Sequence, residues 1–317
     1  MKAPHLTRRL VLSSLGAAGA GLALPARAQS TKIAFGYTAV TDFASIFVAA
    51  EEGFFSKRNL DVELKFIPLN STIPAAIQSD ALQMGGPTPS VFLQAVDGGL
   101  DHVVVAGGGV TSKTITGFGL VARAGSGIRS PQDCIGKKIG VPGLGAFLHV
   151  TFRAWLKQSG LDYKKVNFIE ASFPQHGDLL RGGSLDAVVT ADPFMTRITD
   201  SGAGYVASYY STFLMEGNPT IIHTAKREWV AKNPAAAKAF RDAVIEGAAF
   251  MSQTRNNDKV RAAIAKYTKL PIEVVAKIQI SPPGPVVNEK QLNYWVGLMK
   301  DQEMLKTSPN VATLIAR

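Results

Sequence analysis

The stretch Thr31–Phe66, TKIAFGYTAVTDFASIFVAAEEGFFSKRNLDVELKF, changes its hydrophobic period twice. Apolar residues alternate over residues 33–37, which is the period of a β-strand. They then recur at helical spacing from Phe43 to Ala50, and a glycine follows shortly after, as at many helix ends. Alternation returns over residues 62–66. The stretch therefore predicts a strand, an amphipathic helix and a second strand.

The same alternation of elements continues beyond this stretch. A helix is predicted from Ser71 or Thr72, with Pro74 in its first turn, and another follows Pro89. The short apolar run HVVVAG, residues 102–107, suits a buried parallel strand. Strand–helix–strand units connect through right-handed crossovers, so the pattern predicts an α/β fold with mainly parallel sheets.

A second α/β unit is predicted from about Ser126, and an extended piece and a mostly helical tail follow from about Gly217. Asn288 and Gln291 are placed as a capping box in that tail. Composition does not shift sharply between the units, so two lobes are inferred from the order of elements. Further elements are predicted in the segments 139–141, 166–171, 174–183, 185–192, 219–224, 235–251, 258–267 and 288–299, with a helix within the stretch 141–160 and another that begins at Asp192-Pro193.

Residues 1–28 have the layout of an export signal. Arg8 and Arg9 precede an apolar run, and Ala26-Arg27-Ala28 forms a small-x-small cleavage motif. The paired arginines resemble the twin-arginine type. A membrane anchor is the weaker alternative, because the apolar run is shorter than the roughly 20 residues that span a bilayer. We expect cleavage after Ala28 and a soluble protein in the periplasm.

Charge and reactive residues exclude several function classes. The formal net charge of +10 falls to +6 when the four basic residues of the signal leave, and no Lys/Arg cluster supports nucleic-acid binding. The single cysteine, Cys134, excludes an internal disulfide and suits a small buried side chain. The histidines lack metal-ligand spacing, and hydrolase and P-loop motifs do not occur. We expect no metal, no cofactor and no enzymatic activity.

Several strings in order carry a family resemblance. They are FVAAEEGFFSKRNLDVELKFIPLNSTIPAAIQSDALQMGG (47–86), GSGIRSPQDCIGKKIGVP (125–142), FRAWLKQSGLDYKKV (152–166) and GGSLDAVVTADPF (182–194). Together they resemble the periplasmic substrate-binding proteins of ABC importers for sulfonates, taurine, nitrate and thiamine-related pyrimidines. The likeness extends from about Thr31 to Gly204, and the tail string AKREWVAKNPAAAKAF (225–240) also suits this family.

The resemblance implies a two-lobed periplasmic-binding-protein clamshell of type II, each lobe a mainly parallel sheet flanked by helices. Lobe one would comprise residues 29–124 and 218–317, and lobe two residues 125–217. A small organic ligand would bind between the lobes, and the partners would be an ABC permease and its ATPase. We expect a monomer. Two alternatives are a ligand sensor for a membrane receptor and a pyrimidine-precursor synthase-like enzyme, although that enzyme class carries a cysteine-rich motif.

Ligands of open α/β sheets bind beyond the carboxyl ends of the strands, next to helix N-termini. The residues expected there also have structural roles to fill: Thr88, Ser90 and Asp192 suit helix caps, and His149 suits a solvated helix face. The candidate ligand-binding residues at these strand ends are Tyr37, Thr38, Phe43, Thr88, Ser90, Gly145, Ala146, Phe147, His149, Asp192 and Phe194.

The loop at residues 143–149, GLGAFLH, departs from the family pattern. Sulfonate and taurine members are rich in Ser and Thr here, and a tryptophan often stands near Ala191 and Asp192. The missing hydroxyls predict an aromatic or heterocyclic ligand, with or without a carboxylate or sulfonate group, rather than a bare oxyanion. The loop is also no dinucleotide fingerprint, because Leu148 occupies the place of the third glycine.

Overall fold

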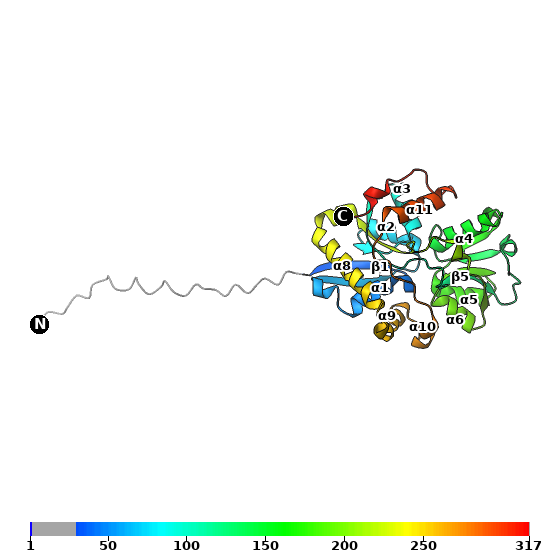
Figure 1. The fold of residues 1–317 in the computed structure, drawn as a ribbon, viewed down its shortest axis with the longest axis horizontal. Helices are drawn as coiled ribbons and strands as arrows, with labels where there is room; N and C mark the ends of the chain where they lie inside the picture. Colours follow the sequence, from blue (N-terminus) through cyan, green and yellow to red (C-terminus); the bar gives the residue numbers. More distant parts are fainter. Residues whose placement is uncertain (2–29, 317) are drawn as a thin grey trace.

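The computed structural model describes Met1 and residues 30–316, so the expected export signal lies outside the described residues. These residues form two α/β lobes side by side (Figure 1). The strand β1 and the helices α1 and α8 lie in one lobe, and β5, α4, α5 and α6 lie in the other. The predicted α/β two-lobed fold is confirmed.

The first sheet has the strand order β2-β1-β3-β10-β4. β1 pairs in parallel with both β2 and β3, whereas β10 runs antiparallel to its neighbours β3 and β4. One reversed strand thus interrupts a mainly parallel sheet. The strands are β1 (Thr31–Tyr37), β2 (Leu60–Phe66), β3 (Met84–Gly85), β4 (His102–Gly107) and β10 (Ile222–Lys226).

The second sheet repeats this arrangement in the order β7-β6-β8-β5-β9. Here β5 is the reversed strand, because it pairs antiparallel with β8 and β9 while β6 pairs in parallel with β7 and β8. The strands are β5 (Phe118–Arg123), β6 (Lys138–Val141), β7 (Asn167–Glu170), β8 (Ala187–Ala191) and β9 (Gly204–Ser208).

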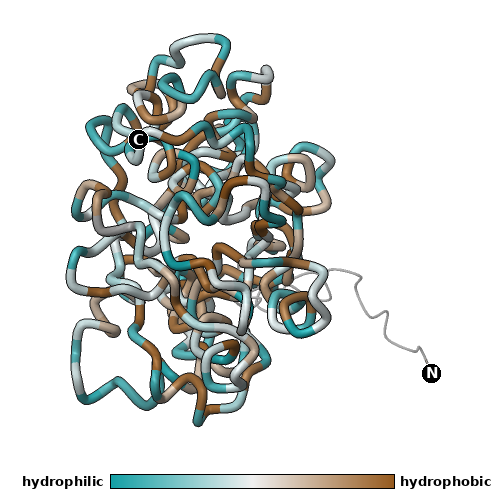
Figure 2. The backbone as a smooth tube through the Cα atoms, turned by 90° about the vertical axis from the view of Figure 1, so that its right-hand side faces the viewer, coloured by the Kyte–Doolittle hydropathy of each residue, from teal (hydrophilic) through white to brown (hydrophobic). Residues whose placement is uncertain are grey.

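Helices flank both sheets (Figure 1) and contribute buried apolar residues to the core. Figure 2 shows how hydrophobic (brown) and hydrophilic (teal) residues alternate along the chain. None of the helices described is long and apolar enough to cross a bilayer. The helices of the first lobe are α1 (Ala44–Glu51), α2 (Ile73–Gln78), α3 (Pro89–Asp97), α7 (Arg227–Lys232), α8 (Pro234–Met251), α9 (Asn257–Thr268), α10 (Ile272–Lys277) and α11 (Glu289–Lys300). Those of the second are α4 (Phe147–Gln158), α5 (His176–Arg181) and α6 (Phe194–Asp200).

One-turn 3-10 helices connect many of these elements. Some of them precede an α-helix directly, as Thr41–Phe43 precedes α1. They lie at Thr41–Phe43, Ser56–Arg58, Asn70–Thr72, Gln132–Cys134, Tyr163–Lys165, Phe173–Gln175, Tyr210–Phe213, Thr254–Asn256 and Val311–Leu314.

The sheets shift the boundary between the lobes. The sequence-based division assigns residues 118–123 to lobe one, but they form β5, which pairs in the second sheet. The chain therefore crosses between the sheets in the segments 108–117 and 209–221. We propose residues 118–208 as lobe two, and the segments before and after the two crossings as lobe one.

Three segments pack together where the chain leaves lobe one. Residues 107–111 bond to residues 217–221 on one side and to residues 282–285 on the other, through backbone hydrogen bonds of 2.7–3.0 Å. The backbones approach so closely that a Cβ on Gly107 would lie 2.1 Å from the carbonyl oxygen of Gly284. Only glycine fits such an approach. This junction therefore joins the two crossings and the segment 282–285 by close backbone contacts.

His223 lies in the middle of the first lobe's aromatic core. It is fully buried, with Phe35 at 5.2 Å and Phe43 at 6.3 Å between ring centres. Neither ring nitrogen has a hydrogen-bond partner within residues 30–316, and burial lowers the pKa of His223 to about 3. A buried polar group without a partner costs about 1–3 kcal/mol. His223 is therefore a polar group that weakens the core.

Replacing this histidine (His223→Leu) is expected to raise the free energy of unfolding by about 1 kcal/mol at neutral pH. The wild-type ring also makes the protein sensitive to acid. Below pH 6.5, His223 is protonated in the unfolded chain but stays neutral in the folded protein, so the free energy of unfolding decreases as the pH falls. The variant should remove about 1.4 kcal/mol per pH unit of that loss between pH 6 and 4. Urea unfolding at several pH values measures both effects.

His176 provides the matched control. It is equally buried, but its Nε2 lies 2.9 Å from the carbonyl oxygen of Ala171. The change His176→Leu leaves that carbonyl unpaired and should lower stability. Equal losses from both substitutions would show that the missing hydrogen bonds of His223 carry no cost.

Candidate ligand-binding cleft

A cavity of about 40 Å³ lies between the lobes, beyond the carboxyl ends of strands from both sheets. This volume corresponds to about three water-sized spheres, so the lobes are closed on a small space. Among the described residues, the cavity is lined by Thr38, Val40, Asp42, Asn70, Thr88, Phe118, Pro142, Ala146, Phe147, Leu148, Phe173, Ala191, Thr220 and Ile221.

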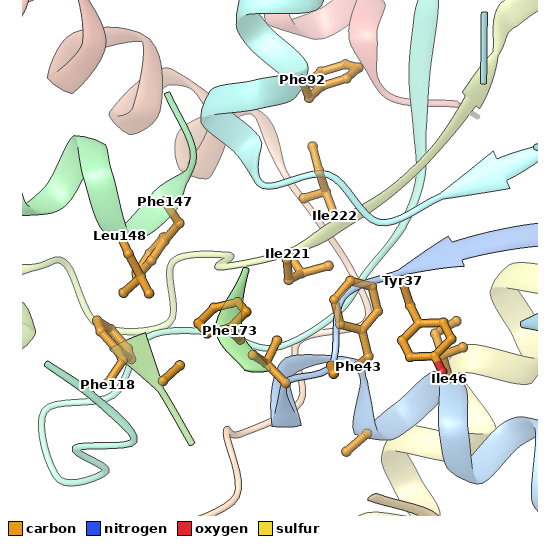
Figure 3. Packing of buried hydrophobic residues seen from close by; sticks show 14 of the residues in the cluster. Tyr37, Phe43, Ile46, Phe92, Phe118, Phe147, Leu148, Phe173, Ile221 and Ile222 are labelled. Carbon is orange, nitrogen blue, oxygen red and sulfur yellow. The ribbon is translucent and has the colours of Figure 1, made fainter. Parts of the chain in front are cut away.

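The wall from lobe two is apolar. Phe147 begins α4 and packs its ring edge against Phe118 of β5 at 5.0 Å between ring centres. Phe173 stacks on Phe194 at 5.9 Å, and Leu148 lies beside Phe147 (Figure 3). These contacts hold the rings in place, so lobe two offers a preformed apolar surface.

The wall from lobe one carries most of the polar groups. Asn70 is fixed by both atoms of its amide: Nδ2 donates to the carbonyl of Gly86 at 3.0 Å, and Oδ1 accepts from the backbone N–H of Thr88 at 2.8 Å. The Thr88 hydroxyl accepts from Val91 N–H at 3.4 Å, which confirms its predicted role as the cap of α3. The polar wall is thus ordered by its own hydrogen bonds.

Asp42 is the ionisable residue of the cavity wall. It lies in the 3-10 helix Thr41–Phe43 between β1 and α1, and its side chain is buried. Oδ1 accepts from the hydroxyl of Thr220, which belongs to the second crossing. Burial raises the pKa of Asp42, and hydrogen bonds from Thr220, from its own backbone and from Ser281 oppose that rise. The carboxylate is therefore held in a water-poor place next to the cavity.

Four of the residues predicted for the site line the cavity: Thr38, Thr88, Ala146 and Phe147. The other seven do not line it. Tyr37 packs in the core and donates from its hydroxyl to the carbonyl of Tyr267 at 3.1 Å. Phe43, Ser90 and Phe194 are likewise buried, and Gly145, His149 and Asp192 make the contacts described next.

Gly145 and His149 shape the loop before α4. Gly145 adopts a φ of +77°, in the left-handed region that favours glycine. Its N–H donates to Nδ1 of His149 at 2.8 Å, and its carbonyl accepts from Gln94 of lobe one at 3.1 Å. The expectation of a solvated histidine is wrong, because His149 is 6% exposed and burial, helped by the charge of Arg153, lowers its pKa to about 3.

Asp192 serves the helix that follows it. Its Oδ1 accepts from the backbone N–H of Thr196 at 3.0 Å and from the Thr196 hydroxyl at 2.8 Å. These bonds satisfy a free N–H at the start of α6, as the capping interpretation predicts. Burial raises the pKa of Asp192 to about 6, and the two bonds from Thr196 oppose this shift.

Most of the cavity wall escaped the sequence-based prediction. Phe118 was missed because β5 was not recognised, and Asp42 because one turn of 3-10 helix separates the strand from α1. Thr220 and Ile221 belong to the predicted extended piece 219–224, which reads equally well as a core strand. The residues missed were Val40, Asp42, Asn70, Phe118, Pro142, Leu148, Phe173, Ala191, Thr220 and Ile221.

The turn after α11, which belongs to lobe one, forms hydrogen bonds with α4 of lobe two. Arg153 donates to the carbonyl of Gln302 at 3.2 Å, and Lys157 donates to the carbonyl of Asp301 at 2.7 Å. The side chain of Gln302 reaches the carbonyl of Val150 at 3.0 Å. The polar face of α4, which periodicity assigns to solvent, is thus covered by the other lobe.

Further polar contacts join the lobes elsewhere. Ser71 donates to Oε1 of Glu170 at 2.9 Å, and Lys277 pairs with Asp200 at 2.6 Å. Together with the turn after α11, these contacts join the two lobes at several places. This arrangement, with the lobes in contact over a small cavity, is referred to as closed.

Cys134 is buried and bonds weakly to the carbonyl of Ser130 at 3.7 Å. Burial, with a contribution from the charge of Asp133, raises the pKa of its thiol to about 12. It is therefore a small core side chain, as predicted, rather than a nucleophile. Within the described part of the chain, His, Cys, Asp and Glu form no cluster of three or more that could hold a metal ion.

Known proteins resemble this chain over most of its length. The profile of the NMT1/THI5-like family matches residues 40–257. The nitrate/nitrite binding protein NrtA of Synechococcus elongatus is 24% identical over 270 residues, which are 76% of this chain and 60% of NrtA. The nitrate import ATP-binding protein NrtC of Synechocystis is 24% identical over 280 residues, 84% of this chain and 41% of NrtC. The chain thus spans less than two thirds of these relatives.

Solved structures share the fold. The alkanesulfonate-binding protein SsuA of Xanthomonas axonopodis pv. citri, bound to MOPS, superposes with a TM-score of 0.77. The two sequences are 17% identical, and the match covers 92% of this chain and 99% of SsuA. At this identity the likeness establishes the two-lobed fold.

Proposed function

Because the chain belongs to the NMT1/THI5-like family, we propose that it is a substrate-binding protein of an ABC importer. It captures a small organic ligand between its lobes and delivers the ligand to a permease, while an ATPase supplies the energy. The closed cavity with walls from both lobes carries this proposal, since ligand and closure then depend on each other. The partial match to NrtC, an import ATP-binding protein, supports an ATPase partner.

The protein would work as a monomer in the periplasm, where the expected export signal would direct it. No bond is made or broken in this function. The buried thiol of Cys134 and the aromatic wall fit a site for binding rather than for catalysis. Opening on the permease would release the ligand.

The ligand is proposed to be an aromatic or heterocyclic compound. Phe118, Phe147 and Phe173 offer ring faces and edges on one side of the cavity, and the loop before α4 presents no hydroxyl. A bare ion such as nitrate would lose its hydration on entering the cavity, and the apolar wall would not replace the lost hydrogen bonds. A carboxylate or sulfonate group on the ligand would meet Thr88 and Asn70 but no side-chain cation among the described lining residues.

Calorimetric titration with pyrimidines, aromatic acids, nitrate and taurine tests this proposal. At least one planar organic compound is expected to bind with one site per chain. At a concentration of about 100 times its Kd, that compound should add about 2.7 kcal/mol to the free energy of unfolding. Binding of nitrate or taurine alone would contradict the proposed ligand class and leave the transport role standing.

The fluorescence of Trp295 provides a second measurement of ligand binding. Its ring in lobe one lies 5.4 Å from that of Phe147 in lobe two, between ring centres. Opening of the lobes separates the two rings and admits water, so ligand-induced closure should change tryptophan fluorescence. A Trp295→Phe variant that binds ligand without the fluorescence change identifies the source of the signal.

A further inference from the structure

The charge of the cavity is negative or zero rather than positive. Among the described residues that line the cavity, Asp42 is the one with an ionisable side chain, and Lys, Arg and His are absent. Asp192 follows the lining residue Ala191 and is a second buried acid. An anion that enters this space finds carboxylates nearby and no cation to balance its charge.

The basic groups of α4, the helix that begins at the cavity, are engaged elsewhere. Arg153 and Lys157 on α4 bond to backbone carbonyls of the turn after α11. His149 is an acceptor at Nδ1, because the N–H of Gly145 donates to it at 2.8 Å. These groups close the lobes and shape the loop, so they leave the cavity without positive charge.

Asp42 retains acceptor capacity. A carboxylate offers two oxygens with about four lone-pair positions. Thr220 donates to Oδ1, and Ser281 lies close enough to oppose the effect of burial on the pKa. Because Asp42 lines the cavity, acceptor positions of its carboxylate that Thr220 does not use can serve a ligand donor.

The carboxylate of Asp42 is also held rigidly. The backbone carbonyl of Asp42 accepts from the N–H of Gly109 at 2.8 Å, and a Cβ on Gly109 would lie 2.7 Å from Oδ1. Gly109 belongs to the first crossing and Thr220 to the second. Asp42 is therefore positioned by the junction between the lobes, next to the cavity that closure encloses. Because this acceptor is already fixed, little conformational entropy is lost when a donor binds to it.

We infer that Asp42 recognises a nitrogen-bound hydrogen of the ligand, so that the cleft takes compounds with an amino, amidine or protonated ring nitrogen and rejects bare oxyanions. This inference rests on the proposed function and narrows its ligand class. An N–H donor completes the hydrogen bonding of a buried carboxylate, and a positive charge also compensates its desolvation. The ring of such a compound would lie against Phe118, Phe147 and Phe173.

Asp42 also links the two crossings, and the experiment has to separate this structural role from recognition. The change Asp42→Asn keeps the size of the side chain and an oxygen for Thr220, but removes the charge and half of the acceptor capacity. The change Thr111→Val leaves Asp42 intact and removes another link between the crossings, where the N–H of Asn218 donates to the Thr111 hydroxyl at 2.9 Å outside the cavity lining. The exposed Asp101, which pairs with Arg227 at 2.8 Å, supplies the control Asp101→Asn.

Two sets of probes differ in charge while their shape stays nearly constant. Guanidinium, urea and nitrate are small and planar with three arms, and benzamidine, benzamide and benzoate repeat the charge series on a ring. Calorimetry with the full-length exported protein should give an affinity for the cationic member at least about tenfold above that for the anionic member. Asp42→Asn should abolish that preference. Thr111→Val and Asp101→Asn should keep it.

The outcomes separate the inference about Asp42 from the proposed function as a substrate-binding protein. A wild-type preference for nitrate or benzoate overturns the inference and leaves a binding protein for anions. Loss of the cation preference in Thr111→Val as well as in Asp42→Asn also overturns it, because the linkage of the crossings would then be the cause. If none of the six compounds binds to folded wild-type protein, the proposed organic ligand class and the inference fall together.

Discussion

The substitution Phe147→Asp is expected to weaken ligand binding by at least about a hundredfold while both lobes stay folded. Phe147 is 5% exposed in the closed form, where it meets Phe118 of its own lobe and Trp295 of the other. A carboxylate there has no partner, and burying it costs several kcal/mol. The open form leaves that position in water, so the cost opposes closure rather than folding.

Calorimetry with the tightest-binding compound of the titration panel measures this effect, and circular dichroism of the ligand-free variant checks the fold. The control Phe147→Leu retains an apolar side chain and should lose less than about tenfold in affinity. Unchanged affinity of the aspartate variant would remove Phe147 from the site.

The substitution Trp295→Ala is expected to lower the free energy of unfolding by about 4 kcal/mol. Trp295 is fully buried on α11, and its indole N–H donates to the carbonyl of Pro219 at 3.1 Å. Removing the ring leaves a large void, and the carbonyl of Pro219 loses its donor. Because Pro219 belongs to the second crossing, the damage reaches the junction between the lobes.

Urea unfolding followed by circular dichroism measures the loss. Trp229 on α7 is only half-buried and provides the matched control, since Trp229→Ala removes the same atoms from a place that water already reaches. The control should lose clearly less stability. Equal losses in the two variants would show that burial at Trp295 does not set the cost.

Strong local periodicity was enough to predict most of the fold. β1, α1 and β2 follow the alternation of Thr31–Phe66, and the capping box of Asn288 and Gln291 begins α11 as predicted. The strand β3 is only two residues long and carries no period. β5 contains Gly119, where a Cβ would lie 2.6 Å from the carbonyl oxygen of Ser208 in β9. The close pairing of these two strands therefore requires glycine at this position.

The site was predicted less well, because its walls depend on contacts between distant segments. Asp42 and Thr220 are 178 positions apart and meet only at the junction between the lobes. His149, Arg153 and Lys157 follow one another at steps of four residues and share one face of α4. Polarity does not reveal what covers a face, and here the turn after α11 covers it.

The shared strand order of the two sheets has a consequence for how the chain folds. Residues 118–208 form the second sheet from one continuous segment, whereas the first sheet needs β10 to reach β3 and β4 across that whole segment. Closing so long a loop is slow in a flexible chain and faster once the intervening segment is compact. During synthesis the second lobe can therefore fold first and bring the two ends of the interrupted lobe together, so that one lobe serves as the folding template of the other.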